Sequence, residues 1–209
     1  MTWSYLSAAE AVAALVADER VAAVWDRPSA LERMTVAALA GHLARAVTQA
    51  AQVLRAPAPD AAPIPLVEHY TRSAWVGADL DDPANTMIRD TGDAEAAEGP
   101  AALAARTRAA LDALREHLAT EQPARPVLLP WTGWALTVED FLTTRMLEIS
   151  VHVDDLAVSA GIPTPALPEE VLDPVLTLLH RLAVRRHGPL AVLRALSRAE
   201  RAPRTIAAI

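Results

Sequence analysis

The sequence predicts an all-α fold. Apolar residues recur at intervals of three and four along most of the 209 residues, which is the period of an amphipathic helix. Pro-rich breaks divide these stretches, and no long alternating strand pattern is present, although short pieces such as Val127–Leu129 are ambiguous. Because 52% of the residues are hydrophobic, the chain can bury a real core, either as one domain or as one domain with a small appendage.

Two helices are expected before the first Pro-rich break. Ser7 and Glu10 match a capping box, and the first helix is expected to continue to about Trp25. Thr35 is the expected N-cap of the second helix, which the segment Pro57–Pro65 brings to an end.

The middle of the chain is expected to be less regular. A helix is predicted over residues 67–76, whereas residues 80–99 are rich in Asp, Gly and Glu and are expected to form a polar excursion of little structure. Pro100 opens a helix predicted over residues 100–120. Residues 123–133 are expected to be a linker.

The last third of the chain begins with a long helix. Thr137 is its expected N-cap, with Asp140 at the third helical position in a variant of the capping box, and Gly161 ends it. Two further helices are predicted over residues 168–187 and 189–201.

Composition excludes several classes of protein. There is no run of 18 apolar residues and no basic, cleavable N-terminal segment, so we expect a soluble, cytoplasmic protein without a membrane partner. The absence of cysteine excludes disulfides, zinc–thiolate sites and a cysteine nucleophile, so any thiol in the chemistry must come from a ligand. Nucleic acid is not an expected partner, because the net charge is −7 and the basic tail has no interleaved aromatic residues.

Basic residues gather at the C-terminal end. All 19 basic residues are arginine, and seven of them follow residue 180, where Glu200 is the only acidic residue. This tail is expected to lie against the acidic body of the protein or to bind an anion. Arg194 and Arg198 lie one helical turn apart in it, and they either bind carboxylates of a thiol cofactor or substrate or pair with the acidic body.

Glu148 and His152 are the strongest candidates for a functional site. Their spacing of four residues puts both side chains on one helix face, among apolar neighbours where an unpaired carboxylate is costly to bury. His42, from another helix, can supply a third ligand to a shared zinc ion, with one position left open for chemistry. The alternative is a core ion pair or a histidine satisfied by the backbone. His117 and Glu121 have the same spacing but lie at a helix end, so they are expected to form a solvated pair.

Three segments resemble the N-terminal metal-binding domain of the mycothiol-dependent maleylpyruvate isomerase family, within the DinB-like four-helix bundles: WDRP at residues 25–28, TVAALAGHL at 35–43 and RMLEISVHVDDLA at 145–157. The resemblance implies a DinB-like bundle over residues 1–161, with residues 162–209 as a short, Arg-rich helical extension packed on it. The family's best-described member has a separate α/β C-terminal domain instead, so thiol contacts assigned to that domain do not transfer to this chain.

The resemblance also implies a metal site and a chemistry. In the family, a histidine of the second helix and a glutamate and a histidine of a later helix bind zinc, and these positions correspond to His42, Glu148 and His152. An open position on Zn²⁺, or on another divalent metal, takes the sulfur of mycothiol and lowers its pKa. The thiolate then adds to an electrophilic carbon of a small substrate. In an isomerase the thiol is later eliminated, and in a transferase it stays on the product.

Several other residues allow two interpretations each. Arg145 either steadies the site carboxylate or binds an acidic substrate, unless it forms an ordinary helical ion pair. Asp155 either orients a ligand histidine or lies on a solvated helix face. Trp131 and Trp134 either wall a pocket at the mouth of the bundle, where Trp134 contacts the cofactor, or fold back over the core. The remaining histidines have no partner at ligand spacing and are expected to be structural: His69, His180 and His187.

Two functional classes remain open. The first is a metal- and thiol-dependent isomerase or transferase that acts on a small electrophile. The second is a non-catalytic, metal-stabilised bundle that holds a small molecule or dimerises through its helices. The Ala- and Leu-rich helical surface is compatible with a homodimer in either case.

Overall fold

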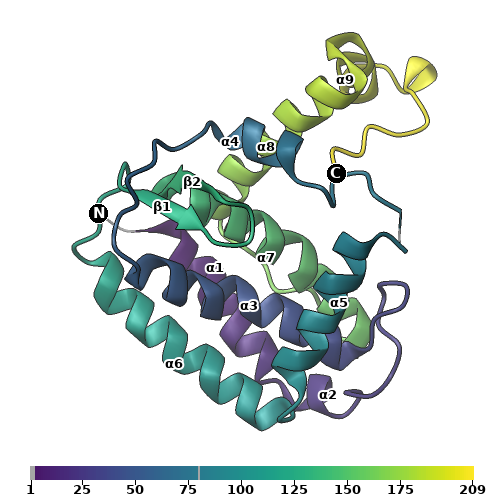
Figure 1. Cartoon of the computed structure of the whole chain (residues 1–209). Coiled ribbons are helices and arrows are strands. Elements are labelled where there is room, and N and C mark those ends of the chain that lie inside the picture. The colour runs from purple at the N-terminus through teal and green to yellow at the C-terminus, as the bar shows by residue number, and fades with distance from the viewer. Residues whose placement is uncertain (1–2, 80) are drawn as a thin grey trace.

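A four-helix bundle forms the centre of the protein. The structure is a computed structural model that describes residues 3–79 and 81–209. The bundle helices are α1 (Ser4–Val16), α3 (Val36–Arg55), α6 (Pro100–Leu118) and α7 (Val138–Ala160). α3 contacts the other three, and Figure 1 shows it beside α6 with α7 above them. The predicted all-α fold class is confirmed, and none of the described helices is both long and apolar enough to cross a membrane.

The two helices that carry the candidate ligands have the predicted N-caps. The hydroxyl oxygen of Thr35 accepts a hydrogen bond from the backbone N–H of Ala38 at 3.0 Å, and that of Thr137 accepts one from Asp140 at 3.0 Å. Each bond satisfies an amide that the first helical turn leaves free. Gly161 follows α7 in the left-handed conformation, with φ of 66°, as expected for a helix-ending glycine. These local features fix where α3 and α7 begin and where α7 ends.

The N-terminal segment differs from the prediction. Ser7 lies inside α1, so the predicted capping box is wrong. Trp3 anchors the helix start instead, because its indole N–H donates to the carbonyl oxygen of Leu118 at 2.8 Å. Glu10 pairs with arginines of α6 rather than with the backbone. A separate short helix, α2 (Glu19–Ala22), replaces the rest of the predicted first helix.

Part of the predicted polar excursion forms a helix, so that prediction is wrong. α5 (Pro83–Ala96) begins after Asp82, whose carboxylate accepts a backbone hydrogen bond at 2.8 Å. α5 packs along α3, and its buried residues are Gly92 and Ala96. Small residues therefore make this contact, and the stripe of large apolar residues that predicts a helix is missing. Residue 80, at the start of the predicted excursion, lies outside the described residues.

Two short strands replace part of the linker predicted over residues 123–133. β1 (Pro126–Leu129) and β2 (Trp134–Thr137) pair antiparallel, and Val127 lies opposite Leu136 with both side chains buried. Strands of 4 residues are too short to show an alternating pattern in the sequence. This hairpin leads directly into α7.

α4 (Leu66–Arg72) lies next to the hairpin and is shorter than the helix predicted over residues 67–76. The backbone N–H of Ile64 donates to the carbonyl oxygen of Ala135 at 2.9 Å, which joins the segment before α4 to β2. α4 also contacts the C-terminal extension. It therefore lies between the hairpin and the extension.

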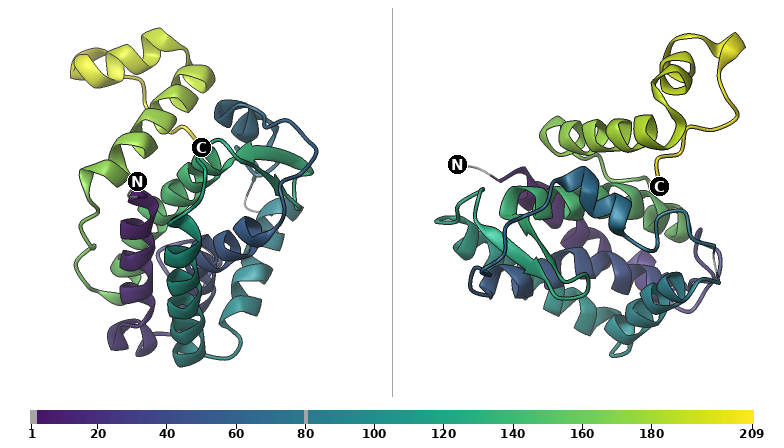
Figure 2. Two further views of the ribbon diagram at one scale, coloured as in Figure 1. Left: turned by 90° about the vertical axis from the view of Figure 1, so that its left-hand side faces the viewer. Right: turned by 45° about the horizontal axis from the view of Figure 1, so that its top comes forward.

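The C-terminal extension is helical, as the sequence predicts. α8 packs on α1 and α7, whereas α9 packs on α8, and Figure 2 shows α9 and the turn after it standing away from the bundle. The tail then returns, because the Nε2 atom of His187 lies 2.7 Å from the carbonyl oxygen of Ala207. The division of the chain at residue 161 remains a prediction. The extension consists of α8 (Glu169–His187), α9 (Pro189–Ser197) and a 3-10 turn, η1 (Ala199–Arg201).

The arginines of the extension do not form the predicted ion pairs with the acidic body. Within the described residues, the only ion pair of an arginine after residue 180 joins Arg201 to Glu200 of the same turn. Arg194 and Arg198 lie on or just after α9, which stands away from the bundle (Figure 2), and the arginines of α8 are exposed. The excess positive charge of this segment is therefore exposed.

Candidate metal centre

α3 and α7 bring His42, Glu148 and His152 together. Nε2 of His42 lies 3.3 Å from Oε2 of Glu148, and Nε2 of His152 lies 3.5 Å from the same oxygen. The two imidazole rings meet edge to face with centroids 4.7 Å apart. One ligand atom from each residue lies within 4.8 Å of the others, and each side chain is 18% exposed. The cluster is therefore largely buried but still reachable from solvent.

Asp155 fixes the orientation of His152. Its Oδ2 atom lies 2.9 Å from Nδ1 of His152, one helical turn away on α7. A carboxylate accepts hydrogen bonds, so this contact places a proton on Nδ1 and leaves Nε2 directed at Glu148 and His42. Metal-binding histidines commonly have such a partner on the second nitrogen. The contact supports the predicted role of Asp155, and metal binding itself remains a prediction.

The charges of the cluster favour an ionised carboxylate. Burial acts to raise the pKa of Glu148, but hydrogen bonds from His152 and His42 and the charge of Arg145 hold that pKa well below its usual value. Burial acts to lower the pKa of His152, but Asp155 and Glu148 raise it to about 9. A cation entering the cluster therefore meets an ionised carboxylate, and at neutral pH it displaces the proton on Nε2 of His152.

The donor set fits a divalent metal such as zinc. Zinc binds imidazole nitrogen and carboxylate oxygen at roughly 2.0–2.2 Å, so two such ligands on a tetrahedral ion lie roughly 3.3–3.5 Å apart. The two N···O separations of 3.3 and 3.5 Å match that spacing. Three protein donors also leave a coordination position for an external ligand, which is the arrangement of catalytic rather than structural zinc sites.

His117 and Glu121, which are also four residues apart, make a different contact from that of Glu148 and His152. Nε2 of His117 lies 2.9 Å from Oε2 of Glu121, but Arg125 also binds both oxygens of that carboxylate, at 2.9 and 2.5 Å. The prediction of a solvated helix end is wrong, because Arg125 folds over the carboxylate and leaves its side chain 5% exposed. A guanidinium already neutralises this carboxylate, so the pair serves as a control for the triad.

Arg145 lies beside the triad without a carboxylate partner. Its guanidinium donates to Oγ1 of Thr144 at 3.1 Å and to Oε1 of Gln49 at 3.3 Å, and its Cζ lies 5.6 Å from the ring centroid of Phe141. Among the described residues it forms no ion pair, so the ordinary helical pair is not observed. Its charge nevertheless helps to lower the pKa of Glu148. The predicted role in binding an acidic substrate remains a prediction.

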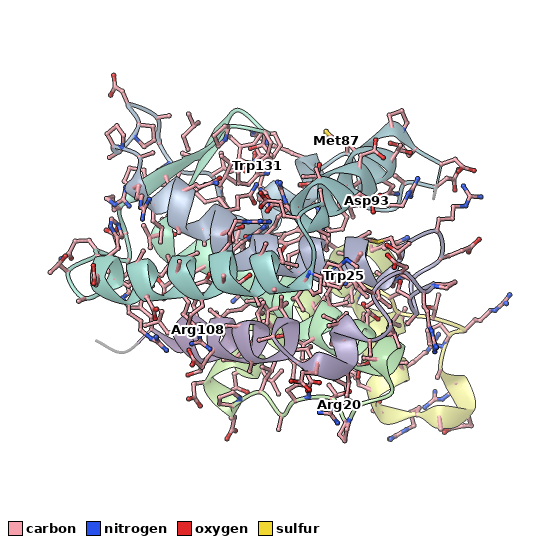
Figure 3. All side chains as sticks on the ribbon, turned by 90° about the horizontal axis from the view of Figure 1, so that it is seen from below. Arg20, Trp25, Met87, Asp93, Arg108 and Trp131 are labelled. Carbon is pink, nitrogen blue, oxygen red and sulfur yellow. The ribbon has the colours of Figure 1, made fainter. Side chains whose placement is uncertain are left out.

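The two tryptophans of the hairpin differ in their contacts. Trp131 is 45% exposed at the turn, where Figure 3 labels it, so it does not fold back over the core. Trp134 is half-buried, and its indole N–H donates to Nδ1 of His69 at 3.0 Å. From the sequence, His69 is expected to be structural, because no residue at ligand spacing can pair with it. The partners lie 65 residues apart, so local spacing could not have revealed this contact.

Arg194 and Arg198 lie far along the extension. Both are exposed on or just after α9, which packs on α8 rather than along the helices of the triad (Figure 2). Their assignment to thiol or substrate binding remains a prediction, and no contact among the described residues brings them to the triad.

Comparison with protein families gives one match that covers most of the chain. The family described as the mycothiol maleylpyruvate isomerase N-terminal domain matches residues 5–157. This span contains the whole triad and ends just before the end of α7. No curated protein sequence matches significantly.

Two solved structures are similar to this chain. The crystal structure of the mycothiol-dependent maleylpyruvate isomerase superposes with a TM-score of 0.51 at 17% identity, covering 88% of this chain and 72% of that one. A histidine-to-alanine mutant of that enzyme gives a TM-score of 0.49 at 16% identity, with the same coverage. At this level of identity the likeness concerns the fold, and it confirms the predicted DinB-like bundle.

Proposed function

This chain belongs to the mycothiol maleylpyruvate isomerase N-terminal domain family, and we propose on that premise that it is an enzyme in which a low-molecular-weight thiol attacks a small electrophile. The observation that carries the proposal is the meeting of His42, Glu148 and His152 from α3 and α7. The missing cysteine agrees with it, because the nucleophilic sulfur then comes from a cosubstrate.

The residues proposed to hold Zn²⁺ or another divalent cation are His42, Glu148 and His152. Asp155 keeps one proton of His152 on Nδ1, so Nε2 is the nitrogen that gives up its proton and offers its lone pair when a cation binds. A cation bound there supplies positive charge that lowers the pKa of a thiol in the open position. Mycothiol is the proposed thiol, because the family and the similar crystal structure are both named for it.

Arg145 is proposed to bind a negatively charged group of the substrate. Gln49, Thr144 and Phe141 already hold its side chain, so little conformational freedom is lost when an anion binds. Its guanidinium has no carboxylate partner among the described residues, which leaves the charge available to a ligand. This arrangement favours a substrate that carries both an electrophilic carbon and a carboxylate.

The proposed reaction is isomerase-like. The thiolate adds to one carbon of a conjugated double bond, the resulting single bond rotates, and elimination of the thiol restores the double bond in the other configuration. The thiol is regenerated, so no other reactant is consumed. A transferase would begin with the same addition and release the thioether as its product.

Turnover by matched variants tests this proposal. Zinc-loaded protein is incubated with maleylpyruvate and mycothiol, and the change in double-bond geometry is followed by ultraviolet absorbance. We expect conversion by the wild type only when the thiol is present, loss of conversion in His152→Ala, and full conversion in His117→Ala. Zinc bound by the wild type without turnover, across a panel of thiols and electrophiles, would instead assign the chain to the non-catalytic binding bundles.

A further inference from the structure

Two adjoining cavities lie between α4 and α8, which are in contact and are seen side by side in Figure 1. The first has a volume of about 310 Å³ and the second of about 410 Å³, and both are lined by Thr71 and Arg185. We call the two together the α4–α8 cleft. No residue of the triad lines it, and cavities of this size hold small molecules. The cleft is therefore a candidate binding site separate from the metal centre.

Three arginines give the cleft a positive charge. Arg185 lines both cavities, Arg186 lines the first and Arg72 lines the second. Glu68 is the only acidic residue that lines either cavity, and Arg72 pairs with it. The charges of the two arginines of α8 are therefore left unbalanced in the cleft.

Arg185 and Arg186 have no partner within the described part of the chain. Neither forms an ion pair, a hydrogen bond or a contact with an aromatic ring there. Arginines elsewhere are paired, as Arg108 and Arg115 are with Glu10. Two adjacent cations repel each other, so an anion bound between them would stabilise this part of the protein.

The guanidinium of Arg186 lies against the wall of the first cavity. A Cβ atom built on Gly77 would lie 3.6 Å from its Nη2 atom, so the guanidinium covers the backbone of Gly77. Two contacts hold this loop: the rings of Tyr70 and Trp75 meet edge to face at 6.1 Å, and the backbone N–H of Ala78 donates to Trp75 at 3.1 Å. The side chain remains exposed, so its N–H groups can still reach a ligand.

The other lining residues indicate what kind of anion fits. Tyr70 and Leu182 are 1% and 5% exposed and form an apolar part of the first cavity. The hydroxyls of Thr71 and Ser73 already donate to backbone carbonyls of α4, at 3.0 and 2.8 Å. The guanidinium groups are therefore the donors left for a ligand, and they lie next to an apolar surface.

We propose that the α4–α8 cleft binds a small organic anion, with its phosphate or carboxylate group on Arg185 and Arg186 and its apolar part against Leu182. The forked N–H groups of a guanidinium match the oxygens of either group. Because one wall belongs to α4 and the other to the C-terminal extension, the bound anion would tie the extension to α4. The inference does not depend on the proposed function, since the triad takes no part in it.

Calorimetric titration of the full-length, zinc-loaded protein tests the inference. The probes are phenyl phosphate, benzoate and the uncharged benzyl alcohol. We expect an anionic probe to bind, more weakly as KCl is added, and benzyl alcohol not to bind. The tighter of the two anions identifies the preferred acidic group. Binding of benzyl alcohol as tight as that of the anions, or binding of neither anion, would overturn the inference.

Variants show which residues hold the anion. Loss of one charge-assisted hydrogen bond typically weakens binding about 10-fold or more, so we expect that loss in Arg185→Gln and in Arg186→Gln. Arg181→Gln is the matched control, because Arg181 is exposed on the same helix and lines neither cavity. An equal loss in Arg181→Gln would mean that the anion responds only to overall charge, which would contradict the proposed site.

His152→Ala separates the cleft from the metal centre, where an anion could bind to zinc. We expect this variant to bind the anionic probe as tightly as the wild type does, whether or not it turns over a substrate. Loss of binding in His152→Ala would place the anion at the triad and overturn the inference. Circular dichroism melts confirm that each variant is folded.

Nuclear magnetic resonance locates the bound probe directly. We expect phenyl phosphate or benzoate to shift the backbone amide resonances of Thr71 and Gly77, which line the first cavity. The amide of Gly133, at the turn of the hairpin, should not move. Saturable binding that leaves Thr71 and Gly77 unshifted would show that the anion binds elsewhere.

Discussion

Gly92 of α5 lies directly against His42 of α3. A Cβ atom built on Gly92 would come within 3.5 Å of the Cβ of His42 and would overlap the backbone carbonyl of Ala38. Gly41 faces the same contact from α3, where its own Cβ would overlap the carbonyl oxygen of Gly92. The two helices therefore meet backbone to backbone at the turn that presents the first candidate ligand.

Gly92→Ala should both destabilise the protein and disturb the centre. Overpacking a tight contact typically costs about 1–3 kcal/mol, and here the strain falls on the turn of α3 that carries His42. We expect a lower free energy of unfolding in urea and weaker zinc binding. Asp93→Ala, at the exposed neighbour labelled in Figure 3, is the control and should change neither. A Gly92→Ala protein with wild-type stability would show that α5 does not press on α3.

Asp155→Asn should weaken metal binding without unfolding the protein. The carboxylate that orients Nδ1 of His152 is lost, and removal of such a partner typically lowers metal affinity about 10–100-fold. Zinc affinity measured by competition with a chelator checks this. Asp154→Asn changes the adjacent carboxylate, which accepts a hydrogen bond from Thr164 at 2.5 Å and does not contact the triad. Equal losses in both variants would contradict the assigned role of Asp155.

Glu121 should make stability fall in acid. Hydrogen bonds from Arg125 are the main cause of its low pKa, about 2 in the folded protein against an ordinary value of 4.5. Because the folded pKa is the lower one, the stabilising contribution is fully present above about pH 4.5 and is lost as the pH falls toward 2.

Urea unfolding of wild type and Glu121→Gln at several pH values measures that contribution. We expect the stability difference between the two proteins to be largest near pH 7 and to shrink below pH 4.5. Glu116→Gln, at an exposed position of α6, should match the wild type throughout. A difference that stays constant down to pH 2.5 would mean that Glu121 acts through packing rather than charge.

The sequence predicts the parts of the fold that depend on local features. Thr35 and Thr137 act as N-caps, and Gly161 ends α7, because a cap needs only a hydroxyl or a glycine a few residues from its partner. α5 was missed because its contact with α3 consists of small residues such as Gly92, which leave no hydrophobic period. The hairpin was missed because its strands are too short for a pattern.

Only part of the candidate site can be predicted from local sequence features. Glu148 and His152 follow from spacing on one helix, whereas His42 needs either the family resemblance or the structure, since nothing local connects it to α7. The contact between Trp134 and His69 depends on how the hairpin meets α4, which no spacing rule reports. The expected homodimer and cytoplasmic location remain predictions.

The metal content of the purified protein tests the central claim most directly. Wild type, His152→Ala and His117→Ala are prepared identically, equilibrated with zinc, passed through a desalting column and analysed by mass spectrometry of the metal, with thermal melts on all three. We expect about one zinc per chain in the wild type and in His117→Ala, and none in His152→Ala. Zinc absent from the wild type, or retained equally by all three proteins, would contradict the assignment of His42, Glu148 and His152 as a metal centre.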